Sequence, residues 1–160
     1  MNNPGGSSLQ RPAKIVSGGQ SGVDRAALDV AIELGIPHGG WCPRGRLAED
    51  GPIPACYALS ETDSPEYPVR TQQNVLDADA TLILCRGEPI GGTELTRRLA
   101  QRHRRPCLVV DLNCPPDRQA IRRWLQQYGV AVLNIAGPRE SQTPGIAAQA
   151  REFLQHCFAE

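Results

Sequence analysis

The sequence lacks several features that mark common classes of protein. Lys14 is its single lysine, and 17 basic residues are balanced by 17 acidic ones, so the formal net charge is +0. Proteins that bind nucleic acid through its phosphates usually present a basic stripe, so we expect no nucleic acid among the partners. Apolar runs reach only about five residues, whereas a membrane-spanning helix needs about 20, so we expect no membrane segment.

The cysteines and histidines do not form the pattern of a metal or catalytic site. No CxxC or CxH pair occurs among the six cysteines, which are Cys42, Cys56, Cys85, Cys107, Cys114 and Cys157. The spacing of zinc ligands is therefore absent, and we expect no structural metal. The chain has no GxSxG motif, and its three histidines lie in unrelated contexts, so no catalytic residue is predicted. No apolar signal segment opens the chain, and we expect reduced, mostly buried thiols in a cytoplasmic protein.

Short apolar runs, separated by helical periods, predict the fold. The clearest strand signals are nearly continuous apolar runs, typical of parallel strands covered on both faces, at residues 13–17, 81–85, 107–112 and 130–136. Between them apolar residues recur at helical spacing, as in the stretch from Val23 to Leu34, which Gly35 closes. This alternation predicts an α/β fold, a Rossmann-like three-layer α/β/α sandwich with a mainly parallel sheet of five or more strands.

The length fits one domain. We expect a disordered tail over residues 1–12 and a single ligand-binding domain over residues 13–160. Residues 42–56 are rich in glycine, proline and charge, which predicts a long loop. We expect the runs 81–85 and 107–112 to be neighbouring parallel strands. The predicted core contains Ile15, Val16, Leu82, Ile83, Leu84, Leu108, Val109, Val110, Val132 and Leu133.

A glycine-rich loop, SGGQSGVD, lies between the first strand and the first helix. Glycines let a ligand approach backbone N–H groups, and the helix N-terminus adds partial positive charge, so such a loop suits an anion. It matches neither a Walker A loop nor a GxGxxG fingerprint. The candidate ligand-binding residues are Gly18, Gly19, Gln20, Ser21, Gly22 and Asp24. The alternative is a tight strand-to-helix turn capped by Ser21 or Asp24.

A second loop, RGEPIGGTE, repeats the arrangement after the strand at residues 81–85. Its candidate residues are Arg86, Gly87, Gly91, Gly92 and Thr93, with Arg86 placed to neutralise a phosphate. The alternative is a flexible loop in which Thr93 is an N-cap. Because the carboxyl ends of parallel strands meet at one edge of a sheet, we expect the amides of both loops to face one pocket.

Two further segments add polar groups. Asn134, Gly137 and Arg139 follow the last strand, where they could read a ligand or simply end the strand in a Gly-Pro turn. Arg70 and Asn74 share one face of a predicted helix at i,i+4 spacing, which is also compatible with an ordinary surface helix.

Arginine supplies almost all of the basic charge. Its planar fork suits bidentate contacts to phosphate, although a general composition preference would give the same bias. In the long loop, Arg44 and Arg46 flank a glycine and precede Glu49 and Asp50. The pair fits either an anion clamp or a solvated charge cluster.

Five motifs occur in one order along the chain: SGGQSGVD, CPRGRLAEDGPIP, RTQQNVLDAD, TLILCRGEPIGGTELT and NIAGPRES. Together they resemble the molybdenum cofactor carrier family, a circularly permuted YpsA-like branch of the Rossmann-like, nucleotide-sensing SLOG superfamily. The resemblance runs from about Lys14 to Phe158, which is essentially the whole predicted domain.

The resemblance implies a homo-oligomer of Rossmann-like subunits that carries the molybdenum cofactor. This cargo is a pterin with a phosphate and a dithiolene-held molybdenum, and its pocket would lie at the strand carboxyl ends. By motif match, residues 18–22 form the first binding loop and residues 91–93 the second, with Arg86 and Asn134 beside them. Molybdoenzymes or cofactor-synthesis proteins would be the protein partners, and the role would be carriage rather than catalysis.

Two other functions stay open from the sequence. A sensor of nucleotide derivatives needs a nucleotide-shaped slot and a partner. The superfamily also contains phosphoribohydrolases, whose motif PGGxGTxxE ends in a glutamate that assists glycosidic cleavage. This chain reads IGGTELTR at that place, so the proline, the third glycine and the glutamate at its offset are missing, and Glu94 directly follows the threonine. An enzyme would need Asp24, Glu94 or Asp50 close to the bond that is cleaved.

Overall fold

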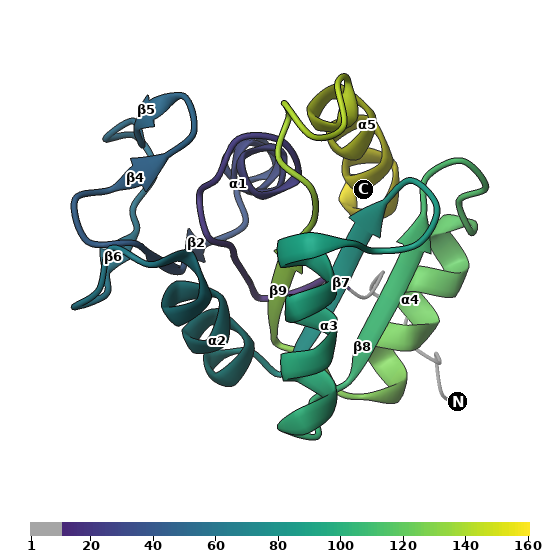
Figure 1. Ribbon diagram of the computed structural model, residues 1–160. Coiled ribbons are helices and arrows are strands. Elements are labelled where there is room, and N and C mark those ends of the chain that lie inside the picture. Colours follow the sequence, from purple (N-terminus) through teal and green to yellow (C-terminus); the bar gives the residue numbers. More distant parts are fainter. Residues whose placement is uncertain (1–10) are drawn as a thin grey trace, which may run out of the picture.

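The computed structural model describes residues 11–160 and contains a central sheet of five parallel strands (Figure 1). The strands are β1 (Lys14–Val16), β2 (His38–Gly39), β7 (Ala80–Cys85), β8 (Cys107–Asp111) and β9 (Val132–Ala136), in the order β2-β1-β9-β7-β8. The two runs predicted to be neighbours are paired in parallel, with Thr81 opposite Cys107 and Cys85 opposite Asp111. The α/β fold with a parallel sheet is therefore confirmed.

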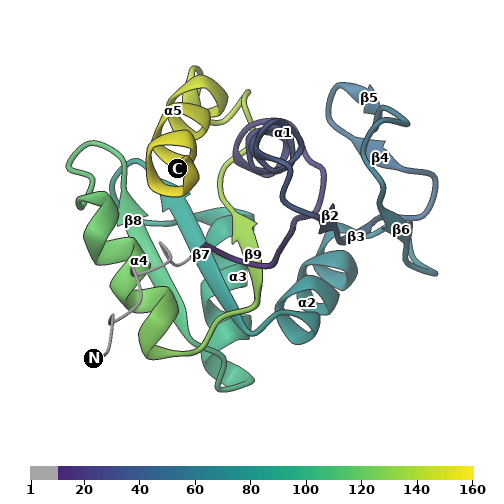
Figure 2. The ribbon, with the colours of Figure 1, turned by 180° about the vertical axis from the view of Figure 1, so that it is seen from behind.

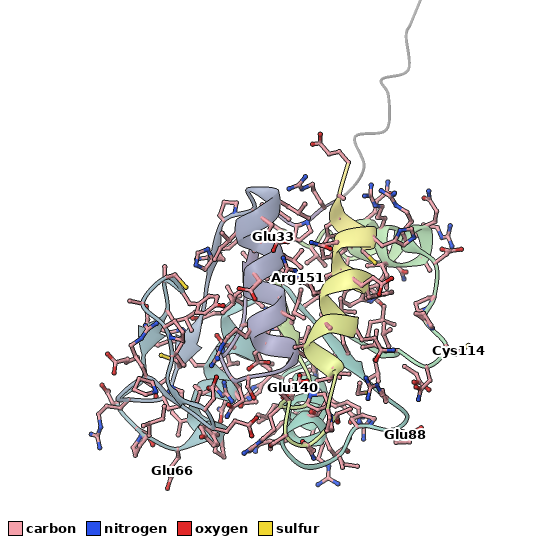
Figure 3. All side chains as sticks on the ribbon, turned by 90° about the horizontal axis from the view of Figure 1, so that it is seen from above. Glu33, Glu66, Glu88, Cys114, Glu140 and Arg151 are labelled. Carbon is pink, nitrogen blue, oxygen red and sulfur yellow. The ribbon has the colours of Figure 1, made fainter. Side chains whose placement is uncertain are left out.

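Helices cover both faces of the sheet and complete three layers. On one face lie α1 (Val23–Leu34), α4 (Arg118–Gln127) and α5 (Ile146–Phe158), and on the other lie α2 (Tyr67–Asp77) and α3 (Gly91–Arg102) (Figures 1 and 2). Helices α1 and α5 lie side by side, and an ion pair between Glu33 and Arg151 joins them (Figure 3).

The first helix forms where its periodicity predicts it. Val23, Ala27, Val30 and Ala31 are fully buried and face the sheet and α5. Gly35 then adopts a left-handed conformation, and its N–H group bonds to the carbonyls of Ala31 and Ile32. This is the expected end of a helix at glycine.

Strand position decides how deeply each predicted core residue is buried. β7 is an interior strand between β9 and β8, and all six of its residues are buried. Leu108 and Val109, predicted to be buried, are only half-buried because β8 is an edge strand with one neighbour. Val132, also predicted to be buried, is half-buried at the amino end of β9, beside exposed Ala131. The other predicted core residues are buried as expected.

The long loop is more ordered than its composition predicts. Within it, β4 (Leu47–Ala48) pairs with β5 (Gly51–Pro52) as an antiparallel hairpin, and β3 (Trp41–Cys42) pairs in parallel with β6 (Ser60–Glu61). We call residues 41–61 the β3–β6 segment. Its side chains Cys42, Ile53 and Tyr57 pack on Leu28 of α1, so the segment lies against that helix.

The expected tail falls almost wholly outside the described residues. Of the two tail positions that are described, Pro12 is buried, and Arg11 donates a hydrogen bond to the Leu34 carbonyl at 2.8 Å. These two residues therefore pack on the domain, which no pattern in the sequence predicts.

The six cysteines are all free thiols, but fewer are buried than the sequence suggests. Cys42, Cys85 and Cys157 are buried, whereas Cys56 and Cys114 are exposed. No helix in residues 11–160 is long and apolar enough to cross a membrane.

Candidate functional site

A cavity of about 340 Å³ opens at the carboxyl edge of the sheet. It is bounded by the loops after β1 and β9, by one face of α2 and by the first turn of α3. These elements meet because β1, β9 and β7 are neighbours in the sheet, so the loops that follow them leave the same edge. The predicted site residues that line the cavity are Gly18, Gln20, Asp24, Arg70, Asn74, Gly91, Gly92, Thr93, Asn134, Gly137 and Arg139.

The first turn of α3 faces the cavity with free amides. Its N-cap residue, Ile90, offers no side-chain hydrogen bond, and the amides of Gly91 and Gly92 have no partner within residues 11–160. An added Cβ at Gly92 would meet no atom within 4 Å, so the space above this turn is open. Free first-turn amides and the helix dipole favour an anion. The second predicted loop therefore has the geometry expected of an anion site.

Several backbone amides of the first predicted loop already donate hydrogen bonds within the protein. The Gln20 amide donates to Asp24 Oδ2 at 3.4 Å, and the Ser21 amide donates to Gln20 Oε1 at 3.0 Å. The Val23 amide donates to the Pro138 carbonyl at 3.2 Å. Gly19, Ser21 and Gly22 do not line the cavity. Three amides of this loop are therefore occupied, whereas those of Gly18, Gly19 and Gly22 have no partner within residues 11–160, and of these three residues only Gly18 lines the cavity.

Two guanidinium groups lie on the cavity wall beside one aromatic ring. Arg70 and Arg139 lie 5.4 Å and 5.6 Å from the ring centroid of Tyr67, within cation–π range. Arg139 forms no ion pair or side-chain hydrogen bond with any described residue, so its donors are available. Tyr67, Pro68, Thr71 and Gln142 also line the cavity, and the sequence analysis missed all four. The spacing of Tyr67, Arg70 and Asn74 on one helical face was a usable signal.

A buried ion pair lies at the floor of the cavity. Arg70 Nη1 lies 3.3 Å from Asp24 Oδ2, and both side chains are about nine-tenths buried, with exposed fractions of 10% and 8%. Burial raises the pKa of Asp24 above its ordinary value, and the positive charge of Arg70 opposes that rise. The pair also explains Gly18, where an added Cβ would lie 1.9 Å from Arg70 Nη1.

Amide side chains complete the floor. Gln20 Oε1 accepts hydrogen bonds from the backbone N–H groups of Ser21 and Glu49, at 3.0 Å and 2.9 Å, while its Nε2 is buried without a partner in the described chain. Asn134 Nδ2 donates to Thr81 Oγ1 at 3.2 Å. Asn74 has a different role, because both its amide atoms bond to the backbone of Trp41, at 2.8 Å and 2.9 Å. It joins α2 to β3.

Four further predicted residues, besides Gly19, Ser21 and Gly22, do not line the cavity. The Arg46 guanidinium donates to the carbonyls of Ile53, Leu59, Pro54 and Tyr57, so it holds the β3–β6 segment together. Arg86 donates to Gln149 Oε1 at 2.7 Å and to the Pro144 carbonyl at 3.0 Å. The Gly87 amide donates to Asp111, and Arg44 is exposed. The spacing of residues in the sequence could not show that backbone carbonyls and a glutamine would accept the hydrogen bonds of Arg46 and Arg86.

Asp24 is the one carboxylate among the described residues that line the cavity. Glu94 instead pairs with Arg97 and Arg98 on α3, and hydrogen bonds from Arg97 hold its pKa down at about 2. Asp50 pairs with Arg25 outside the cavity. Within residues 11–160, no group of three or more His, Cys, Asp or Glu side chains is arranged to hold a metal ion.

Comparisons with known proteins agree with this architecture. A family model described as "Circularly permutated YpsA SLOG family" matches residues 15–158. A crystal structure at 1.45 Å resolution aligns with a TM-score of 0.89 and 45% sequence identity, covering 92% of this chain and 96% of the other. It is described as that of a "Putative molybdenum carrier protein" from Syntrophus aciditrophicus SB. None of the curated proteins compared with the chain matches it. The predicted Rossmann-like fold is confirmed by this likeness.

Proposed function

Because the chain belongs to the circularly permutated YpsA SLOG family, we propose that it binds and carries a phosphate-bearing ligand, with the molybdenum cofactor as its cargo. The ligand occupies the cavity at the carboxyl edge of the sheet. The similar protein described as a molybdenum carrier supports the choice of cargo. The chain is proposed to act as a homo-oligomer that delivers the cargo to molybdoenzymes or cofactor-synthesis proteins.

One observation gives the strongest support for the proposed binding of a phosphate. The free amides of Gly91 and Gly92 lie on the same cavity as Arg139, which has no other partner among the described side chains. A helix N-terminus favours a negative charge by roughly 0.3–1 kcal/mol, and a hydrogen bond to a charged group adds roughly 1.5–3 kcal/mol. Together they contribute about 2–4 kcal/mol to binding a phosphate, with no metal ligand from the protein.

The direct experiment is native mass spectrometry of the untagged protein purified from its own cells, together with molybdenum analysis. We expect a bound species that contains phosphorus and a pterin, with molybdenum in proportion to it. A bound adenosine derivative without molybdenum would instead support the nucleotide sensor. A protein that carries no phosphorus compound, and that takes up none on incubation, would contradict the proposal.

Carriage also predicts an absence of turnover. Glu94 is engaged by two arginines on the outside of α3, and the glutamate of the phosphoribohydrolase motif is missing from this chain. We therefore expect no release of adenine from AMP, measured by chromatography. Release at about 1 per second or faster would establish an enzyme.

A further inference from the structure

The buried end of the cavity, which forms its floor, contains polar groups that an anion alone would not satisfy. Gln20, Asp24, Arg70 and Asn134 line it, and the exposed fractions of the whole residues, backbone included, are 5%, 6%, 8% and 2%. Buried polar groups that lack partners cost free energy, so native proteins rarely leave several of them together. Such a group of side chains indicates a ligand that supplies the missing partners.

The unsatisfied donors are fixed in place. Because two backbone N–H groups bond to Gln20 Oε1, the orientation of the amide is determined, and Nε2 is the atom left without a partner. Arg70 Nε is also buried without a partner, while Nη1 of the same group bonds to Asp24. Both donors belong to residues of the cavity wall.

Acceptors lie beside these donors. Asp24 Oδ2 accepts two long hydrogen bonds, from the Gln20 amide at 3.4 Å and from Arg70 Nη1 at 3.3 Å. A carboxylate offers about four acceptor positions, so Asp24 retains capacity for a further donor. Asn134 Nδ2 donates to Thr81 Oγ1, which leaves Asn134 Oδ1 as a second acceptor besides Asp24. This end of the cavity therefore requires a ligand that both donates and accepts.

Resting on the function proposed above, we propose that this end recognises the 2-amino-4-oxopyrimidine edge that guanine and pterins share. That edge presents an exocyclic amine and a ring N–H next to a carbonyl. Asp24 accepts from the amine and the ring N–H, and Gln20 Nε2 donates to the carbonyl. Adenine has neither the adjacent pair of donors nor the carbonyl, so it fits this set of groups poorly.

The wild-type protein tests the inference by calorimetric titration with GMP, IMP, AMP, neopterin monophosphate and inorganic phosphate. IMP lacks only the 2-amino group of GMP, so the GMP to IMP ratio isolates the contact to Asp24. Because a hydrogen bond to a charged group is lost, GMP is expected to bind about tenfold more tightly than IMP, or better. Equal affinity for GMP and IMP overturns the inference.

Two variants locate the recognition. Asp24→Asn is expected to bring the GMP to IMP ratio close to one. The same change removes a negative charge beside Arg70, so inorganic phosphate should bind at least as tightly as before. Opposite changes in the two affinities could not come from a damaged fold. Gln20→Glu keeps an acceptor for Ser21 and Glu49 but replaces the donor, and is expected to weaken GMP and neopterin monophosphate about tenfold. A GMP to IMP preference that survives Asp24→Asn overturns the assignment.

The titrations also separate this inference from the proposed function. If inorganic phosphate does not bind while the GMP to IMP preference holds, the anion site is wrong and the recognition of the ring stands. If phosphate binds and no preference appears, the reverse is true. Tighter binding of neopterin monophosphate than of GMP supports a pterin cargo. Tighter binding of GMP would agree with the recognition of the shared edge but would contradict a pterin cargo.

Discussion

The two glycine-rich loops at the edge of the sheet are similar in sequence but use their glycines in opposite ways. In the first loop, an added Cβ at Gly18, Gly19 or Gly22 would lie 1.9 Å, 2.6 Å or 2.3 Å from a neighbouring atom. In the second loop, an added Cβ at Gly92 would meet nothing within 4 Å. Glycine thus allows close packing in one loop and leaves space for a ligand in the other.

The backbone amides follow this contrast only in part. The amides of Gln20, Ser21 and Val23 in the first loop donate to Asp24, to the Gln20 side chain and to the Pro138 carbonyl, whereas those of its three glycines have no partner in residues 11–160. Those of Gly91 and Gly92 in the second loop have no partner in residues 11–160. A glycine motif after a strand therefore does not by itself indicate a phosphate site. The deciding property is whether free amides also have open space beside them, as at Gly92.

The largest expected effect is on stability, in the first loop. Gly22 has φ 83° and ψ −131°, a conformation that other residues rarely adopt, and its Cβ position lies 2.3 Å from the Pro138 carbonyl oxygen. Gly22→Ala is expected to lower the free energy of unfolding by about 3 kcal/mol. The matched control, Gly92→Ala, should change it by less than about 0.5 kcal/mol. Urea denaturation measures both, and equal losses would remove the contrast between the loops.

The second effect is on binding, in the second loop. Gly92→Asp places a carboxylate where the anion is proposed to lie, and should weaken phosphate or molybdate about tenfold to a hundredfold. Stability should not fall, because an acidic residue in the first turn of a helix is favourable by roughly 0.3–1 kcal/mol.

Gly92→Asn is the control for bulk without charge, and should retain most of the affinity in the same titration. Unchanged affinity in Gly92→Asp would mean that the anion binds elsewhere.

A third comparison concerns two arginines with different partners. Arg139 has free donors on the cavity, so Arg139→Gln should weaken phosphate by about tenfold and leave the thermal midpoint nearly unchanged. Arg46 instead bonds to four carbonyls of the β3–β6 segment. Arg46→Gln should lower stability by about 1–2 kcal/mol without a change in phosphate affinity. Titration and denaturation of both variants should show a loss of affinity only in Arg139→Gln and a loss of stability only in Arg46→Gln. Weaker phosphate binding in Arg46→Gln would contradict this expectation.

The smallest effect is a pH dependence. Burial raises the pKa of Asp24 in the folded protein, and Arg70 and Arg25 oppose the rise. The stability that this group contributes is therefore present below its ordinary pKa and lost as the pH rises through the raised value. Asp24→Asn removes that dependence, so its stability relative to wild type should increase as the pH rises above about 4, the ordinary pKa of an aspartate. Parallel stability curves for the two proteins would show that Asp24 does not titrate in this way.

The sheet was predictable because buried parallel strands leave continuous apolar runs, as TLILC in β7 does. The place of the candidate site was also predictable, because the loops after parallel strands leave the sheet at the same edge. The partners of individual side chains did not follow. Arg46 and Arg139 look equivalent in the sequence. The Arg46 guanidinium nevertheless donates hydrogen bonds to four backbone carbonyls from residues 53–59, whereas that of Arg139 donates to no carbonyl of the described chain. Such pairing depends on the path of the β3–β6 segment, which no local pattern encodes.

The bonds between Asn74 and Trp41 bear on how fast a ligand leaves. They tie α2, and with it Arg70, to the β3–β6 segment, whereas the free amides belong to α3. A ligand that spans the cavity links these two helices. Their own contact consists of a small apolar cluster that includes Val75, Leu99 and Ala100. For the proposed ligand, the dissociation rate should therefore depend on how readily α2 and α3 separate, and a cavity introduced into that cluster should speed dissociation from a distance.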